Sequence, residues 1–182
     1  MAKPSAQVLR HLTAEFRRLG LEDRLGSALF LPTNWHQSLS DRFEDEPTLV
    51  DKLLRSGAKI TARAVSYNID RVESQQAPDG TYWWAFKPHH TPDDFNPLLD
   101  SIQTAISAET GCRQGRHTPH LSVSYWAPEH LPRMVQIEPI EWILDEVLLV
   151  RGGGSPYSYE VLGSWRLLPA RATVVCEQAQ LF

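Results

Sequence analysis

Two segments of the sequence each place a histidine and a serine two residues apart. They are His36-Gln-Ser38-Leu and His120-Leu-Ser122-Val. Alternate side chains of a β-strand share one face, so each segment, if extended, aims an imidazole and a hydroxyl to the same side. Histidine exchanges protons near neutral pH because its unperturbed pKa is about 6.5. Two such imidazoles can act as acid and base in one reaction, while two hydroxyls hold an anion such as a phosphate.

Two further pairs have the same spacing but belong to other predicted structures. His11 and Thr13 fall in a helical pattern, where positions two apart face different sides. His89 and Thr91 directly precede a proline at the start of another predicted helix. The first two pairs lie in segments that alternate between apolar and polar residues, although Gln37 interrupts the apolar face of the first.

Hydrophobic periodicity and turn residues predict a mixed order of helices and strands. Gly20 should end the first helix, Gly57 the second and Gly111 the third. The sequence Ala77-Pro-Asp-Gly80 predicts a hairpin turn. The expected helices are residues 5–19, 47–57 and 91–110, and the expected strands are 27–31, 35–43, 59–72, 81–87, 119–126, 140–150 and 157–168. A sheet-and-helix unit thus occurs twice, each time with one histidine segment, as in a pseudo-two-fold duplication.

The composition of the chain bears on which partners it can bind and in which compartment it is expected. The net charge of −4 provides no global basic field, so a long DNA duplex is not expected as a partner. Two cysteines, Cys112 and Cys176, do not make a disulfide framework, and residues 1–20 do not resemble a secretory signal. No apolar run reaches membrane-spanning length. We therefore expect a cytoplasmic protein.

The two histidine segments resemble the signature of the two-histidine (2H) phosphoesterase superfamily, also called LigT-like or 2′-5′ RNA ligase-like proteins. That signature is a pair of His-x-Thr/Ser-x motifs. Pro119 before the second motif, the helix ending at Gly111 and the segment Tyr82-Trp-Trp-Ala-Phe86 add to the likeness, which spans residues 27–168. The resemblance implies an α+β, bilobal fold in which two duplicated sheet-and-helix units carry antiparallel sheets that line a central cleft. It also implies a single domain over residues 1–182, with a helical extension (1–26), a family-like core (27–168) and a C-terminal tail (169–182).

The chain departs from the family pattern at a few positions. Both motifs use serine where threonine is commoner, and Gln37 takes a position that is usually aliphatic. Many members carry a basic residue just after the second motif, where this chain has Tyr125 and Trp126. These differences bear on the substrate rather than on the chemistry of the histidines.

The resemblance implies a phosphodiesterase that opens 2′,3′-cyclic phosphates of RNA ends or small nucleotides to 2′-phosphates. By analogy with the family, His36 is the acid that frees the 3′ oxygen, His120 is the base, and Ser38 and Ser122 bind the phosphate. No cofactor or metal is implied. His117, three residues before His120, could suggest a metal pair, but the sequence offers no third ligand.

Two other functions stay open at this stage. One is 2′-5′ RNA ligation or cleavage of 2′-5′ phosphodiester bonds in the same site, and the other is RNA or nucleotide binding without catalysis. The expected partner is an RNA 3′ end or a small cyclic nucleotide, bound by a monomer. Candidate base-stacking residues are Trp84, Tyr125 and Trp126, and candidate phosphate contacts are Arg42, Arg63, Lys87 and Arg151.

Overall fold

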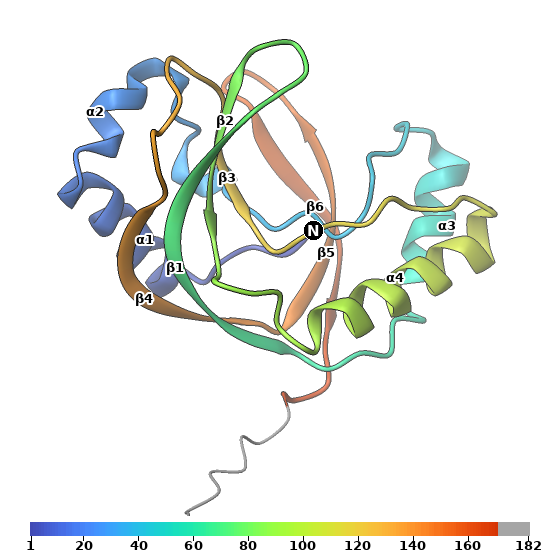
Figure 1. Ribbon diagram of the computed structural model, residues 1–182. Coiled ribbons are helices and arrows are strands. Elements are labelled where there is room, and N and C mark those ends of the chain that lie inside the picture. Colours follow the sequence, from blue (N-terminus) through green and yellow to red (C-terminus); the bar gives the residue numbers. More distant parts are fainter. Residues whose placement is uncertain (171–182) are drawn as a thin grey trace, which may run out of the picture.

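Two antiparallel sheets form the centre of the computed structural model, which describes residues 1–170 (Figure 1). The first sheet has the spatial order β3-β2-β1-β4, from β1 (Val65–Gln76), β2 (Tyr82–Lys87), β3 (Leu121–Ala127) and β4 (Val135–Leu144). The second pairs β5 (Glu146–Gly153) with β6 (Ser158–Arg166). The predicted α+β class with antiparallel sheets is confirmed. Cys176 and most of the predicted tail lie outside the described residues.

Helices lie at both sides of these sheets (Figure 1). On one side are α1 (Ala6–Arg18) and α2 (Leu21–Leu25), and on the other α3 (Pro47–Gly57) and α4 (Phe95–Thr110). The side chain of Ser5 caps α1 by accepting a hydrogen bond from the Val8 amide at 3.3 Å. Gly111 ends α4 at φ 73°, a conformation that suits glycine. The three predicted helices are confirmed, whereas the division of the chain into extension, core and tail stays a prediction.

The predicted hairpin between β1 and β2 is confirmed. Gly80 adopts φ 86°, and its amide donates to the Ala77 carbonyl at 2.9 Å. The Asp79 carboxylate accepts hydrogen bonds from the amide and the hydroxyl of Thr81. Aspartate and glycine therefore close the turn as their side-chain and backbone properties require.

Several predicted strands were wrong in extent or in kind. Residues 27–31 form no strand: a 3₁₀ turn occupies Gly26–Ala28, and the Phe30 amide alone bonds to β3, through the Val123 carbonyl at 2.9 Å. The predicted strand 140–150 is two strands that belong to different sheets, because the chain passes from β4 to β5 at Asp145. The strand predicted over 59–72 begins six residues later, at Val65.

The first histidine segment is extended but is not a strand of either sheet. Its backbone pairs at one point, where Gln37 and Ala2 exchange two hydrogen bonds of 2.9 Å. Burial nevertheless alternates along it: Trp35, Gln37 and Leu39 are buried, and the residues between them are half-buried. The predicted sharing of one face is correct, and the predicted strand is not.

An aromatic cluster holds the residue that precedes His36. The Trp35 side chain is fully buried, with ring centroids 5.9 Å from Phe16 of α1 and 5.4 Å from Phe86 of β2. Its indole N–H donates to the Phe30 carbonyl at 3.1 Å. Burial of large aromatic rings dominates the energetics of a core, so this packing fixes the start of the histidine segment.

Helix α3 packs closely on β6, where Gly163 leaves room for the Trp165 side chain. A Cβ atom at Gly163 would lie 2.6 Å from Cη2 of Trp165 and 2.8 Å from Cδ2 of Leu54. Both distances are shorter than carbon contacts allow, so the helix and the hairpin approach as closely as a glycine permits.

We predict that Gly163→Ala destabilises the protein by about 1–3 kcal/mol through overpacking against Trp165. Gly153→Ala is the matched control, because that glycine lies in β5 with nothing within 4 Å of the added carbon. The measurement is urea unfolding of both variants and the wild type. Equal stability of the two variants would show that the Trp165 contact relaxes at no cost.

Candidate active site

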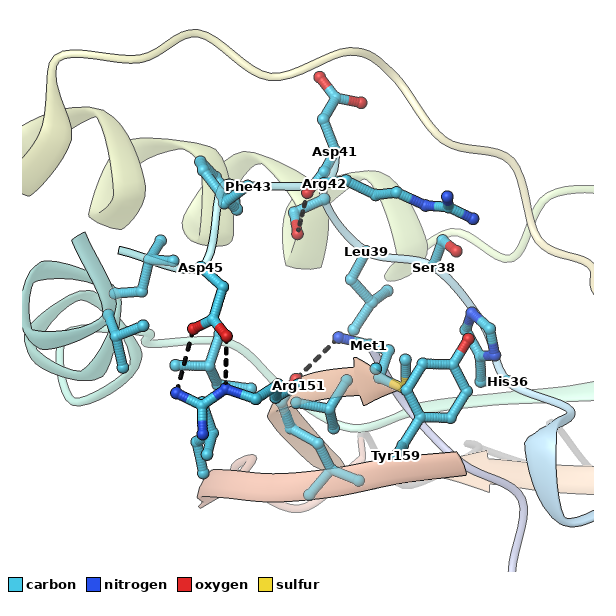
Figure 2. A pocket seen from close by; sticks show the side chains of 18 of the residues that line it. Met1, His36, Ser38, Leu39, Asp41, Arg42, Phe43, Asp45, Arg151 and Tyr159 are labelled. Carbon is cyan, nitrogen blue, oxygen red and sulfur yellow. Dashed lines mark hydrogen bonds and ion pairs between the residues drawn. The ribbon is translucent and has the colours of Figure 1, made fainter. Parts of the chain in front are cut away.

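A cavity of about 500 Å³, here called the His36 cavity, opens between the first histidine segment and the β5–β6 hairpin (Figure 2). His36, Ser38 and Arg42 line it from the first segment, and Tyr125 of β3 and Tyr159 of β6 line it from the two sheets. His120 and Ser122 do not line this cavity. They lie beside it, next to Tyr125 on the same segment of chain.

Both histidines are anchored in the same way. Nδ1 of His36 bonds to the Asn34 carbonyl at 2.7 Å, and Nδ1 of His120 bonds to the Thr118 carbonyl at 2.8 Å. A carbonyl oxygen only accepts, so Nδ1 carries the hydrogen in each ring and the lone pair of the neutral imidazole lies on Nε2. The repeated motif therefore produces a repeated geometry, with Nε2 of each ring available for proton transfer.

Burial lowers the pKa of both histidines, that of His120 to about 4. The positive charges of Lys87, His117 and His36 lower the pKa of His120 further. Both rings are half-buried, each against an aromatic edge. Ring centroids are 5.1 Å apart for His36 and Tyr159, and 4.9 Å apart for His120 and Trp83.

The two serine hydroxyls are free to donate. Ser122 Oγ accepts a hydrogen bond from the indole N–H of Trp83 at 2.8 Å, which leaves its own hydrogen for another acceptor. The Ser38 hydroxyl bonds to no other residue in the part of the chain that the structure describes, and it lies near His36 in Figure 2. Each hydroxyl can thus donate to an anion.

Three of the four candidate phosphate contacts already have partners. Arg151 forms a two-bond ion pair with Asp45 at 2.7 and 3.0 Å at the rim of the His36 cavity (Figure 2). Lys87 Nζ lies 3.0 Å from a Glu73 carboxylate oxygen. The remaining one of the three, Arg63, donates to a backbone carbonyl outside the cavity.

Arg42 is the exception. Among residues 1–170, no carboxylate lies within ion-pair distance of its guanidinium, which extends to the side of the cavity that holds Ser38 and His36 (Figure 2). Burial is the main cause of the lowered pKa of His36, and the charge of Arg42 adds to it. Burial raises the pKa of Tyr159 to about 12, and Arg42 opposes that rise. Arg42 therefore places an uncompensated positive charge beside His36.

The prediction that Trp84 stacks on a base was wrong. Trp84 is fully buried, and its indole N–H donates to the Glu129 carbonyl at 2.9 Å. Its neighbour Trp83 faces the site instead, between His120 and Ser122. Lys87 was the sequence signal for this face, because positions 83 and 87 of a strand point to the same side. In the structure the Lys87 ammonium lies 5.3 Å from the Trp83 ring centroid.

A second hollow, the Trp126 groove, shares Tyr125 with the His36 cavity as a lining residue. It has a volume of about 410 Å³ and is lined by Trp83, Tyr125, Trp126 and the β1–β2 turn. Trp126 is 64% exposed, and its ring and that of Tyr125 pack edge-on against Phe30. Tyr125 and Trp126 are thus accessible to a ligand. Sequence reasoning missed Trp83 and Tyr159, because the buried Trp84 directly follows the first and Tyr157 lies two residues before the second.

Residues 1–170 provide neither a metal-ligand set nor a helix able to span a membrane. That part of the chain contains no group of three or more histidine, cysteine, aspartate or glutamate side chains placed to hold a metal ion. His117 instead faces Asp41, with Nε2 3.3 Å from Oδ1. No helix there has the length and apolar character needed to cross a bilayer.

No protein-family model and no curated protein matches the sequence. Solved structures do match. Apo LigT of E. coli has a TM-score of 0.73 at 14% identity over 92% of this chain and 94% of LigT. A protein described as a phosphoesterase has a TM-score of 0.72 at 17% identity over 92% of this chain and 95% of its own. LigT structures with 3′-AMP, ATP, NADP⁺ and phosphate match as well. The antiparallel sheets and flanking helices thus form a LigT-like fold.

Proposed function

We propose that the protein is a phosphodiesterase that opens 2′,3′-cyclic phosphates to 2′-phosphates without a metal ion. The observation that carries the proposal is the matched anchoring of His36 and His120. Each ring has Nδ1 fixed on a carbonyl two residues earlier and Nε2 available, beside a serine hydroxyl that is free to donate. Paired acid–base catalysis of phosphoester cleavage needs these groups.

Each of the two histidines transfers one proton in the proposed reaction. His120 Nε2 takes a proton from water as the water oxygen bonds to phosphorus. The bond between phosphorus and the 3′ oxygen breaks as His36 Nε2 donates a proton to that oxygen. The low pKa of His120, about 4, keeps that ring unprotonated at neutral pH, as a base requires. The bound phosphate favours the protonated form of His36, because an anion raises the pKa of a nearby histidine.

The phosphate has three donors available. The hydroxyls of Ser38 and Ser122 are free to donate, and the unpaired guanidinium of Arg42 provides positive charge from the first segment. Many family members carry a basic residue after the second motif, where this chain has Tyr125 and Trp126. Arg42 supplies the missing charge from the opposite side of the site.

The nucleoside has two aromatic surfaces available. Tyr159 and Tyr125 line the His36 cavity, and Tyr125 and Trp126 line the Trp126 groove. E. coli LigT, whose fold the chain shares, has been crystallised with 3′-AMP, ATP and NADP⁺, which supports a nucleotide as ligand here. Base–aromatic stacking tolerates different bases, so the proposal covers RNA ends and small cyclic nucleotides.

The Trp126 groove favours a second candidate function, cleavage or formation of 2′-5′ phosphodiester bonds. Such a bond joins two nucleosides, and Tyr125 lines two hollows of about 500 and 410 Å³, each of which could hold one nucleoside. Hydrolysis is the preferred proposal, because the equilibrium in water favours cleavage of a phosphodiester bond over its formation. The expectations of a monomeric, cytoplasmic protein with an RNA or nucleotide partner stay predictions.

We predict that His36→Ala and His120→Ala each lower turnover of an RNA ending in 2′,3′-cyclic phosphate by about 10²–10⁴-fold, the usual contribution of a general acid or base. Product analysis without added metal should show a 2′-phosphate, and excess chelator should not reduce the rate. Full activity in either folded variant would overturn the mechanism. No turnover by the wild type, with retained nucleotide affinity, would favour a binding protein.

The pH profile of kcat/KM should be bell-shaped with its maximum below pH 6.5. The acidic limb follows His120, which must be unprotonated and has a pKa of about 4. The alkaline limb follows His36, which must be protonated and whose pKa lies below its ordinary value. The alkaline limb of kcat should lie at higher pH, because the bound phosphate raises the pKa of His36. A maximum of kcat/KM above pH 7.5 would contradict these assignments.

Arg42→Gln should lower kcat/KM by about 10- to 100-fold, the effect of losing a hydrogen bond to a charged group. Arg63→Gln is the control, since it removes the same charge from a residue that bonds to the Pro169 carbonyl outside the cavity. Steady-state kinetics at low ionic strength measure the difference. Equal effects in the two variants would assign the loss to net charge rather than to phosphate contact.

A further inference from the structure

Gln37, between His36 and Ser38, is a fully buried polar residue. Its amide makes three hydrogen bonds. Nε2 donates to the carbonyls of Ser38 at 2.8 Å and Thr118 at 3.1 Å, and Oε1 accepts from the backbone N–H of His120 at 2.6 Å. Because carbonyls only accept and the amide N–H only donates, this is the one orientation of the side chain that satisfies all three partners.

These contacts bind the second motif at two backbone groups that determine where the His120 ring lies. The Thr118 carbonyl, which Gln37 bonds, is the same oxygen that holds Nδ1 of His120. The backbone of His120 is held by the other end of the amide. Gln37 thus fixes both the ring's hydrogen-bond acceptor and the backbone from which the ring projects.

No β-ladder between the two motifs performs this task. The first histidine segment lies outside both sheets, and its one backbone bridge joins Gln37 to Ala2 rather than to the second motif. A second link joins the segments further along, where Asp41 Oδ2 accepts from the Gly115 amide at 2.6 Å and the Asp41 amide donates to Gln114 Oε1 at 3.0 Å. That link does not touch His120.

We propose that Gln37 is a positioning residue that sets the placement of His120 relative to His36 by bonding the backbone of the second motif. An aliphatic side chain, the usual residue at this position in the family, cannot make these bonds. The proposal rests on the proposed function for its effect on turnover, but its effect on the His120 ring can be measured without any substrate.

The alternative is that Gln37 is only a satisfied polar group of the core. Its loss would then reduce stability without changing the behaviour of His120 in the molecules that remain folded. The two cases differ in the titration of His120, whose charged neighbours Lys87, His117 and His36 are unchanged by substitution at Gln37.

The test uses Gln37→Met, which keeps the length of the side chain and removes its hydrogen bonds. Gln114→Met is the matched control, because it breaks the other glutamine link between the same two segments. In Gln37→Met we expect kcat to fall by about 10- to 100-fold with KM changed less than about threefold, since small displacements of a catalytic group cost this much. The NMR titration midpoint of His120 should rise as the ring gains access to water. Gln114→Met should change neither.

A second variant preserves the bridge. Gln37→Glu has the same length, and a buried, neutral carboxyl group offers one acceptor for the His120 N–H and one donor for the Thr118 carbonyl. It should retain more kcat than Gln37→Met. Unchanged kcat and an unchanged His120 midpoint in Gln37→Met, or equal losses in Gln37→Met and Gln114→Met, would overturn the proposal.

The wild-type protein gives a measurement that does not depend on the folding of any variant. The His120 amide proton, bonded to Gln37, should exchange slowly with solvent. Rapid exchange would show that the bond is not formed and would overturn the proposal. Absence of turnover by a wild type with slow exchange would instead count against the proposed function and leave the positioning role in place.

Discussion

The packing of Trp35 against Phe16 and Phe86 is the interaction on which the site depends. It joins helix α1, the first histidine segment and strand β2 in one buried cluster. Within residues 1–170 the segment belongs to neither sheet, so this cluster, the bridge to Ala2 and the hydrogen bonds of Gln37 and Asp41 to the segment of the second motif hold it in place. His36 directly follows the buried Trp35 in the chain, so its side chain is directed to the opposite side, into the cavity.

Burial changes the pKa of both histidines and therefore the proton transfers that they can perform. Removing an imidazole from water disfavours its charged form, which lowers the pKa of His36 and His120. Carbonyl acceptors at Asn34 and Thr118 fix the tautomer. In the proposed reaction His36 is the acid, and a bound phosphate favours its protonated form, so protonation of that ring is coupled to anion binding.

Much of the fold followed from local patterns in the sequence. Glycines at helix ends, the turn at Ala77–Gly80 and the alternation after His120 predicted elements that the structure contains. Local patterns do not reveal which strand pairs with which. The first histidine segment was therefore predicted to be a strand. The change of sheet at Asp145 was not predicted, because apolar residues typical of a strand lie on both sides of Asp145 and Glu146.

The site was predicted less completely than the fold. The two histidines and serines followed from spacing, whereas Trp83 and Trp84 are adjacent and both aromatic, so only the pairing of β2 decides which one faces the cleft. In the sequence Gln37 only interrupted an apolar face. Its proposed positioning role depends on hydrogen bonds to Thr118 and His120, more than 80 residues away, and no local pattern predicts such contacts.

The free guanidinium of Arg42 has a consequence for the reach of the site. The chain carries a net charge of −4, so at long range its field repels polyanions, and the attraction of one arginine extends over about a Debye length, roughly 8 Å at physiological ionic strength. A short anion with one phosphate gains that attraction and meets less repulsion from the net charge than a long polyanion does. The charges of the molecule thus favour short anions over long ones, independent of any contact with a base.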